Sequence, residues 1–297
     1  MTGLTNPIES QGSAWDDRVP FRVDYLAHGL RIRVAGGSPE VIDLARQELP
    51  PGQFELARDD LDVDRSYRIF ASDEALAGFY LYTNDERSGP FHSLGTTVER
   101  LESSIQIYVA EFAQPYLFLH AGVVQWLGMT IVLPGSSFAG KSTLTRALVN
   151  EGATYFSDEF AVLDEQGRVR PYARKLSHRS GPLGPTGRLN LDAHAPVQDE
   201  SFVPPLIDVV ALIRFQAESL WEAHRLTGGE AVLAMSEHMV AIRNRPAETL
   251  QMLVNVAEHA DVYRCTRPDL DSALTWLRAL AENRDPLSTM SMQVIQE

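Results

Sequence analysis

The spacing of apolar residues predicts a small mixed region in the first third of the chain. The runs FRVDYL and LRIRVA alternate apolar and polar residues on either side of AHG, which is the pattern of a β-hairpin. SYRIFAS and GFYLYTN share this alternation and indicate two further strands. SPEVIDLARQEL opens with a capping serine and a proline at the first helical position, which predicts a helix. We therefore expect residues 21–114 to form an α+β region.

A longer helix is expected at the end of this region, from about Thr96 to Phe112. Apolar residues recur there at steps of three and four, which places them on one helical face. We expect this helix to join the first region to the second. The positions on that face are Val98, Leu101, Ile105, Tyr108 and Phe112.

The pattern changes near residue 115 to that of a buried sheet. YLFLHAGVVQ and MTIVLPG are apolar and β-branched, and WLG separates them as a turn. The second run leads directly into a glycine-rich loop, and KSTLTRALVNEG then has helical spacing up to Gly152. ATYFS predicts the next strand, which ends at Asp158, and FAVLD, EQGR and VRPYAR predict a hairpin after it.

The last part of the chain returns to strands and helices after a gap. Residues 177–206 are rich in Gly, Pro, Ser and Asp and have no periodicity, so we expect a long loop. LIDVVALIRF predicts a core strand. GGEAVLAMSEHMVA and PAETLQMLVNVAEHA predict two helices, VYRCT a strand, and PDLDSALTWLRALAE a final helix. The expected fold class is α/β, or α+β.

Charge and composition limit the classes of partner. The 297 residues carry a formal net charge of −14, which repels nucleic acid and anionic membranes, so any anion site must be local. No apolar run approaches the ~20 residues that span a bilayer. Residues 1–20 lack the features of a signal peptide and are expected to be a flexible tail. We therefore expect a cytoplasmic protein. Its single cysteine, Cys265, lies in an alternating run and is expected to be an inert packing residue.

Residues 135–142, GSSFAGKS, match the phosphate-loop pattern GxxxxGK[ST] in full. Its glycines let backbone N–H groups turn toward phosphate oxygens, and the following helix directs its positive end at the same anion. Lys141 is expected at the β- and γ-phosphates, and the Ser142 hydroxyl is expected on Mg²⁺. The expected cofactors are ATP and Mg²⁺. The residues expected to bind the nucleotide are Gly135, Ser136, Ser137, Phe138, Ala139, Gly140, Lys141, Ser142 and Thr143.

Two acids follow the strand after the loop helix. Asp158 and Glu159 are candidates, with Ser142, for the metal, and Asp158 is the candidate catalytic base that accepts the hydroxyl proton. Adjacent residues of a strand point to opposite faces, so only a break in the strand lets both reach the site. Asp164 and Glu165, in the next hairpin turn, are expected to be solvent charges.

A basic stretch comes next, with no acidic residue between Gln166 and Leu191. It contains Lys175, one of only two lysines in the chain. Lysine is a compact point charge that arginine does not replace at phosphate, so we expect Lys175 to be catalytic and Arg174 and Arg179 to bind phosphate or substrate. The alternative is a basic surface. The cations are Arg168, Arg170, Arg174, Lys175, Arg179 and Arg188.

His120 lies in the apolar strand before the phosphate loop. A histidine in such a run is either a hydrogen-bonded core residue or a catalytic group.

Together, LHAGVV and IVLPGSSFAGKSTLTRALVNEGATYFSDEFAVL resemble the catalytic domain of the HPr kinase/phosphorylase family and its shorter relatives. The resemblance covers about residues 116–180, and more loosely the chain to about residue 283.

This resemblance implies a fold similar to phosphoenolpyruvate carboxykinase, with a mixed sheet rather than a doubly wound one. It also implies that Asp158 acts on a substrate serine hydroxyl and that His120 lies close to the phosphates. The family carries two aspartates where this chain has Asp158 and Glu159, and a later glycine-rich signature that residues 179–191 lack. These departures disfavour HPr itself as the acceptor.

The expected function is therefore that of an ATP-dependent kinase that phosphorylates a hydroxyl, favouring serine, of a peptide or protein, such as a ribosomal peptide precursor. The alternatives are a small-molecule kinase, a regulatory nucleotide-binding module without transfer activity, and an ATPase. Residues 115–297 are expected to form the catalytic domain. Residues 21–114 are expected to govern acceptor choice or assembly, including a homo-oligomer.

Overall fold

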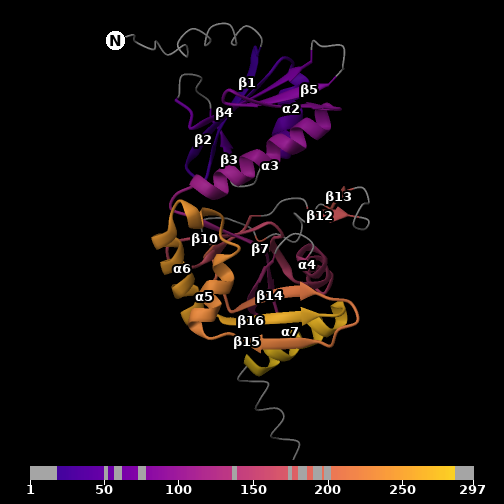
Figure 1. Ribbon diagram of the computed structural model, residues 1–297, viewed down its shortest axis with the longest axis vertical. Coiled ribbons are helices and arrows are strands. Elements are labelled where there is room, and N and C mark those ends of the chain that lie inside the picture. Colours follow the sequence, from indigo (N-terminus) through magenta and orange to yellow (C-terminus); the bar gives the residue numbers. More distant parts are fainter. Residues whose placement is uncertain are drawn as a thin grey trace, which may run out of the picture. The chain divides into compact units, whose positions relative to one another are not determined.

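The computed structural model describes residues 19–49, 53–56, 62–72, 78–135, 139–172, 176–179, 186–189, 196 and 202–284 (Figure 1). The chain divides into two compact units, residues 1–114 and 115–297. This division falls where the sequence predicts the second region to begin. Each unit is built on a mixed sheet of its own, so the fold belongs to the mixed α/β class.

The described part of the N-terminal unit contains a six-stranded sheet in the order β3-β1-β2-β4-β5-β6 and the helices α2 and α3. The predicted hairpin is confirmed: β1 and β2 pair antiparallel through a two-residue turn at His28 and Gly29, both with positive φ. β2 and β4 run parallel, which makes the sheet mixed. The bounds are β1 Phe21–Ala27, β2 Leu30–Gly36, α2 Pro39–Glu48, β3 Gln53–Glu55, β4 Arg65–Ala71, β5 Phe79–Thr83, β6 Glu86–Phe91 and α3 Leu94–Phe112.

The helix α3 is confirmed but begins two residues before the predicted start. Ser93 caps it, because its hydroxyl accepts a hydrogen bond from the Thr96 N–H at 3.1 Å. Val98 and Leu101 are buried on its inner face, as predicted. Phe112, which the periodicity placed on the same face, is 42% exposed because it lies in the last turn.

The C-terminal unit contains an eight-stranded sheet in the order β11-β10-β7-β8-β14-β16-β15, with β9 paired to β7. The central strands β8, β14 and β16 are parallel, and the flanking pairs are antiparallel. The sheet is therefore mixed, as expected. The bounds are β7 Leu117–Trp126, β8 Met129–Pro134, β9 Thr154–Ser157, β10 Phe160–Leu163, β11 Val169–Arg170, β14 Val209–Phe215, β15 Glu222–Arg225 and β16 Asp261–Arg267.

Helices cover both faces of this sheet (Figure 1). Along β14, Val210 packs with α5 and α6, whereas Val209 and Ala211 pack with α4 and α7. This alternation follows from the period-two geometry of a strand and explains why β14 is apolar at successive positions. The bounds are α4 Lys141–Asn150, α5 Gly228–Ser236, the 3-10 helix η3 Val240–Arg243, α6 Pro246–His259 and α7 Leu270–Arg284.

The prediction of an unstructured loop over residues 177–206 is wrong in part. A two-stranded antiparallel sheet, β12 (Leu176–Arg179) and β13 (Thr186–Leu189), overlaps its first part. The edge strand β15 was also not predicted. Among the strands that the structure describes it pairs only with β16, and it is largely exposed, so its sequence has no apolar alternation to reveal it.

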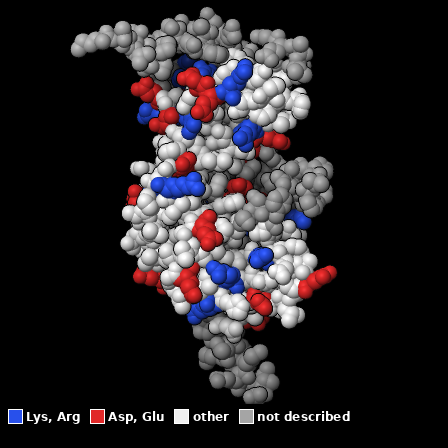
Figure 2. All heavy atoms as spheres, viewed as in Figure 1, with Lys and Arg blue, Asp and Glu red and all other residues white. Residues whose placement is uncertain are grey.

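None of the helices in the described ranges has the length and apolar content needed to cross a membrane. On the face shown in Figure 2, acidic and basic side chains of the described residues are interspersed.

Candidate functional site

The parallel strands of the C-terminal unit end at one edge of the sheet, here called the carboxyl edge. Gly135 follows β8, Phe215 ends β14 and Arg267 ends β16. Ligands of open α/β sheets bind in the crevice outside such strand ends. On β7, Ala121 pairs with Pro134 at the end of β8, so the neighbouring His120 lies beside the entry to the phosphate loop. The fold therefore gathers the predicted loop and histidine.

The phosphate loop ends at Gly140, which has φ +88° and ψ 17° and is the N-cap of α4. This left-handed conformation is strained for residues with a Cβ, which accounts for glycine here. Gly122 on β7 sets how close α4 approaches, because a Cβ there would lie 2.5 Å from Oγ1 of Thr145. Because α4 follows β8 through this loop, its positive N-terminal end lies at the carboxyl edge.

Lys141 is the first residue of α4 and is buried, with 8% exposure. Its Nζ donates a hydrogen bond to the backbone oxygen of Gly135 at 2.6 Å. Burial lowers the pKa of Lys141, and the charges of Glu159 and Asp158 act in the opposite direction. The loop and the two acids thus hold a buried cation where the sequence predicts the phosphates to bind.

Asp158 and Glu159 lie in a break between β9 and β10. Within a continuous strand they would point to opposite faces, so this break is what allows both side chains to reach the site. The hydroxyl of Ser157 accepts hydrogen bonds from the N–H groups of Glu159 at 3.1 Å and Phe160 at 3.0 Å, which stabilises the bend. Asp158 is buried and accepts a hydrogen bond from the Tyr155 hydroxyl at 3.0 Å. Glu159 is more open, with 31% of its side chain exposed.

His120 lies on β7 with its Nε2 3.8 Å from Oε1 of Glu159. Burial, together with the charges of Lys141 and His238, lowers its pKa to about 4. The imidazole is therefore neutral at physiological pH, and its approach to Glu159 is not an ion pair. A neutral imidazole can accept or donate a proton, so both interpretations of His120, structural and catalytic, are compatible with this position.

His238 is a second histidine of this site, and no pattern in the sequence predicts it. Its backbone oxygen accepts a hydrogen bond from the His120 N–H at 2.9 Å, and Met239 bridges to Leu119, so the segment after α5 adds to β7. Burial and the charge of Lys141 lower the pKa of His238, and Glu237 acts in the opposite direction. Its surroundings in the sequence, SEHM, contain no motif that could have revealed it.

No pattern in the sequence predicts Arg267 either. It ends β16, is 3% exposed, and its guanidinium lies against Gly140. Its sequence context, CTRPD, is simply the end of a strand.

The structure gives the element, and in some cases the exposure, of the other predicted site residues that it describes. Ser142 and Thr143 occupy the first turn of α4, where Ser142 is half-buried and Thr143 exposed. Arg179 ends β12. Ser136, Ser137, Phe138, Arg174 and Lys175 lie outside the described residues.

The prediction that Asp164 is a solvent charge is wrong. Its side chain is buried, and Oδ1 accepts hydrogen bonds from the N–H groups of Gln166 at 3.1 Å and Arg168 at 3.0 Å. The carboxylate therefore organises the turn between β10 and β11, as aspartates do in Asx turns. Glu165, its neighbour, is exposed as predicted.

The donor set of the site consists of hard oxygens: the Ser142 hydroxyl and the carboxylates of Asp158 and Glu159. These are ligands that Mg²⁺ prefers, and Mg²⁺ is commonly held by only one or two carboxylates plus substrate phosphates. The described residues contain no group of three or more His, Cys, Asp or Glu side chains placed to hold a metal by themselves. The site thus fits a metal that arrives with a nucleotide.

No known family model and no curated protein matches this chain. The assignment of the site therefore depends on its residues and their geometry.

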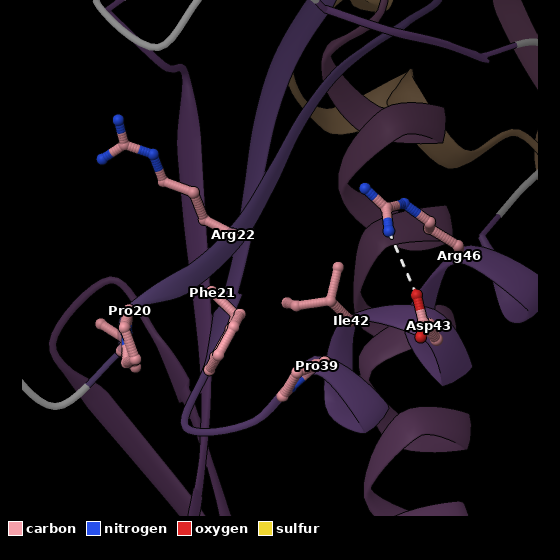
Figure 3. Close-up of a pocket in the computed structure, with 8 residues that line it drawn as sticks. Pro20, Phe21, Arg22, Pro39, Ile42, Asp43 and Arg46 are labelled. Carbon is pink, nitrogen blue, oxygen red and sulfur yellow. Dashed lines mark hydrogen bonds and ion pairs between the residues drawn. The ribbon is translucent and has the colours of Figure 1, made fainter.

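The N-terminal unit has a pocket of its own, of about 570 Å³, between β1 and α2 (Figure 3). Asp43 and Arg46 at its wall pair with each other at 3.2 Å, and Arg46 also contacts Glu55. None of the predicted site residues lines it. Its lining residues are Val19, Pro20, Phe21, Arg22, Pro39, Ile42, Asp43 and Arg46.

Proposed function

We propose that the protein is an ATP-dependent, Mg²⁺-requiring kinase. The observation that carries this proposal is the placement of Lys141, buried at the N-terminal end of α4, beside the acids Asp158 and Glu159 at the carboxyl edge. A phosphate loop alone indicates nucleotide binding. A loop with a lysine and a carboxylate at the same edge has the groups that phosphoryl transfer requires.

In the proposed mechanism Lys141 and the backbone amides of the phosphate loop hold the β- and γ-phosphates. Ser142, Asp158 and Glu159 would hold Mg²⁺, which when bound neutralises charge on the phosphate oxygens. Asp158 accepts the proton of the attacking hydroxyl, and the hydrogen bond from Tyr155 fixes the orientation of its carboxylate. Positioning and electrostatic stabilisation then supply most of the rate enhancement.

We also propose a specific fold for the C-terminal unit. The resemblance of about residues 116–180 to HPr kinase/phosphorylase catalytic domains, and the mixed sheet of the C-terminal unit, support a fold like that of phosphoenolpyruvate carboxykinase. The same resemblance supports a serine hydroxyl of a peptide or protein, such as a ribosomal peptide precursor, as the acceptor. The N-terminal unit would select this acceptor or mediate assembly.

The proposed site also includes cations of the basic stretch, which would contact the γ-phosphate or an anionic group of the acceptor. These residues are Arg174, Lys175 and Arg179. In the sequence these residues come after the hairpin of β10 and β11, which follows the two acids. In this role, Lys175→Ala should lower the transfer rate at least about tenfold.

The test is incubation of the pure protein with γ-labelled ATP, Mg²⁺ and a cell extract. Label on a peptide, a protein or a small hydroxyl compound supports a kinase and also identifies the acceptor class. Release of free phosphate alone would indicate an ATPase, and tight binding without transfer or release would indicate a regulatory module. Either of these two results would overturn the proposal.

A further inference from the structure

The last residue of β16 places a guanidinium against the N-terminal end of α4. A Cβ added to Gly140 would collide with Nη2 of Arg267 and lie 3.5 Å from its Cζ. On the other side, the guanidinium carbon lies 5.2 Å from the centre of the Phe215 ring, at the paired end of β14. The cation is thus held between an aromatic ring and the last residues of the phosphate loop.

Arg267 is 3% exposed, and its buried Nε has no hydrogen-bond partner within the described residues. Burial lowers the pKa of Arg267, and the charge of Asp269 acts in the opposite direction. That carboxylate is exposed, however, and caps α7 by accepting a hydrogen bond from the Ser272 N–H at 2.8 Å. Arginine is rarely buried without a partner, because an unpaired buried charge is strongly destabilising.

The surroundings make this position more unfavourable still. The N-terminal end of a helix carries a positive partial charge, so a cation there is repelled. Lys141 adds a second buried cation to the same helix end. Asp158 and Glu159 act on Lys141, but neither of them acts on Arg267, so its burial beside this positive helix end favours binding of an anion.

We propose that Arg267 binds the polyphosphate of the nucleotide, together with the phosphate loop. This inference rests on the proposed nucleotide binding. It adds to the phosphate loop a binding residue from a strand that lies more than a hundred residues further along the sequence. Its planar fork of donors suits bidentate contact with phosphate oxygens, and Phe215 holds the fork in place through a cation–π contact. Arg267 is then a binding residue whose cost to the ligand-free protein is offset by the ligand.

The alternative is a structural role in which Arg267 only packs on Phe215. The two roles predict opposite effects on the ligand-free protein. A structural arginine should destabilise the fold when it is replaced. A phosphate-binding arginine without a partner can be replaced by an apolar residue with no loss, or with a gain, of stability, because a desolvated charge is removed.

The test measures thermal unfolding and binding of ATP and of inorganic pyrophosphate in the full chain. Arg267→Met should keep or raise the midpoint of thermal unfolding, and it should lower the affinity for ATP and for pyrophosphate at least about tenfold. Arg264→Gln is the matched control, because Arg264 lies on the same strand but is exposed, and it should bind both ligands as the wild type does. Pyrophosphate has no nucleobase or ribose, so a loss of affinity for this probe shows that Arg267 acts on the phosphate groups.

Wild-type affinity for both ligands in a folded Arg267→Met protein would overturn the inference and leave the proposed function intact. Absence of ATP binding in the wild type would overturn both. Should Arg267→Met not fold, Arg267→Lys decides, because it keeps the charge and loses the planar fork. We expect its affinity for both ligands to fall at least about threefold, and unchanged affinity would contradict a phosphate contact.

Discussion

Nζ of Lys141 and the backbone oxygen of Gly135 lie 2.6 Å apart, across the two ends of the phosphate loop. The lysine thus closes onto its own loop. A compact ammonium on a flexible stem can form this contact within a buried space, whereas a planar guanidinium requires a wider one. This geometry gives a physical reason for a lysine here in a chain that otherwise uses arginine at all but one of its basic Lys or Arg positions.

Replacement of Lys141 should therefore be severe even when the charge is kept. We expect both Lys141→Ala and Lys141→Arg to weaken ATP binding at least about tenfold, or by ~1.4 kcal/mol. Calorimetric titration measures this effect, with the exposed Arg264→Gln as the control. ATP affinity equal to that of the wild type in Lys141→Ala would show that the nucleotide does not bind at this loop.

The local part of the site could be predicted from the sequence. Strand, loop and helix follow one another around Lys141, and the acids come one strand later, so short-range patterns were sufficient. The bend that brings Asp158 and Glu159 to one edge depends on the Ser157 hydroxyl, and strand alternation could state only that such a bend was needed.

The distant part of the site could not be predicted in this way. Arg267 reaches Gly140 only because β16 lies beside β14 and β14 beside β8, and strand order is not encoded in local periodicity. His238 reaches His120 through a backbone hydrogen bond, which any residue could form. Turn residues are usually exposed, so the sequence predicts a solvent charge at Asp164, whereas in the structure its carboxylate is buried and accepts hydrogen bonds from two backbone N–H groups.

Acidification should destabilise the C-terminal unit through His120. Its pKa is about 4 in the folded state and near 6.5 when unfolded, so the unfolded chain binds the proton more readily. The stabilisation is present above pH 6.5 and is lost as the pH falls toward 4. Between pH 7 and 5 the loss is up to about 2 kcal/mol, and the partial exposure of the side chain makes it smaller.

Urea unfolding at pH 7 and pH 5 measures this loss in the wild type and in His120→Gln. The wild type should lose more stability on acidification than the variant, which has no titrating group at this position. Equal losses in the two proteins would show that His120 keeps an ordinary pKa in the folded state.

Asp164 and Glu165 form a matched pair for the turn after β10. We expect Asp164→Ala to lower the free energy of unfolding by about 1–2 kcal/mol, because two backbone N–H groups lose their acceptor. Glu165→Ala should change it by less than about 0.5 kcal/mol, since that side chain is exposed. Chemical unfolding measures both, and equal effects would contradict the turn-forming role of Asp164.

The single thiol of the chain should be unreactive in the folded protein. Cys265 is 1% exposed among α4 and α7 side chains, and burial raises its pKa to about 12. Since the thiolate is the nucleophile, we expect a disulfide reagent at pH 8 to label the unfolded chain rapidly and the native chain only on unfolding. Rapid labelling of the native protein would contradict the packing of β16.

The most direct measurement of the central claim compares transfer of label from γ-labelled ATP by the wild type and by Asp158→Asn in the same extract. Asparagine keeps the size of the side chain but cannot accept the hydroxyl proton. Asp164→Asn, a change at a buried aspartate of the nearby turn, is the control and should transfer as the wild type does. We expect Asp158→Asn to bind ATP within a few-fold of the wild type and to transfer no label. Unchanged transfer by Asp158→Asn would contradict the proposed mechanism.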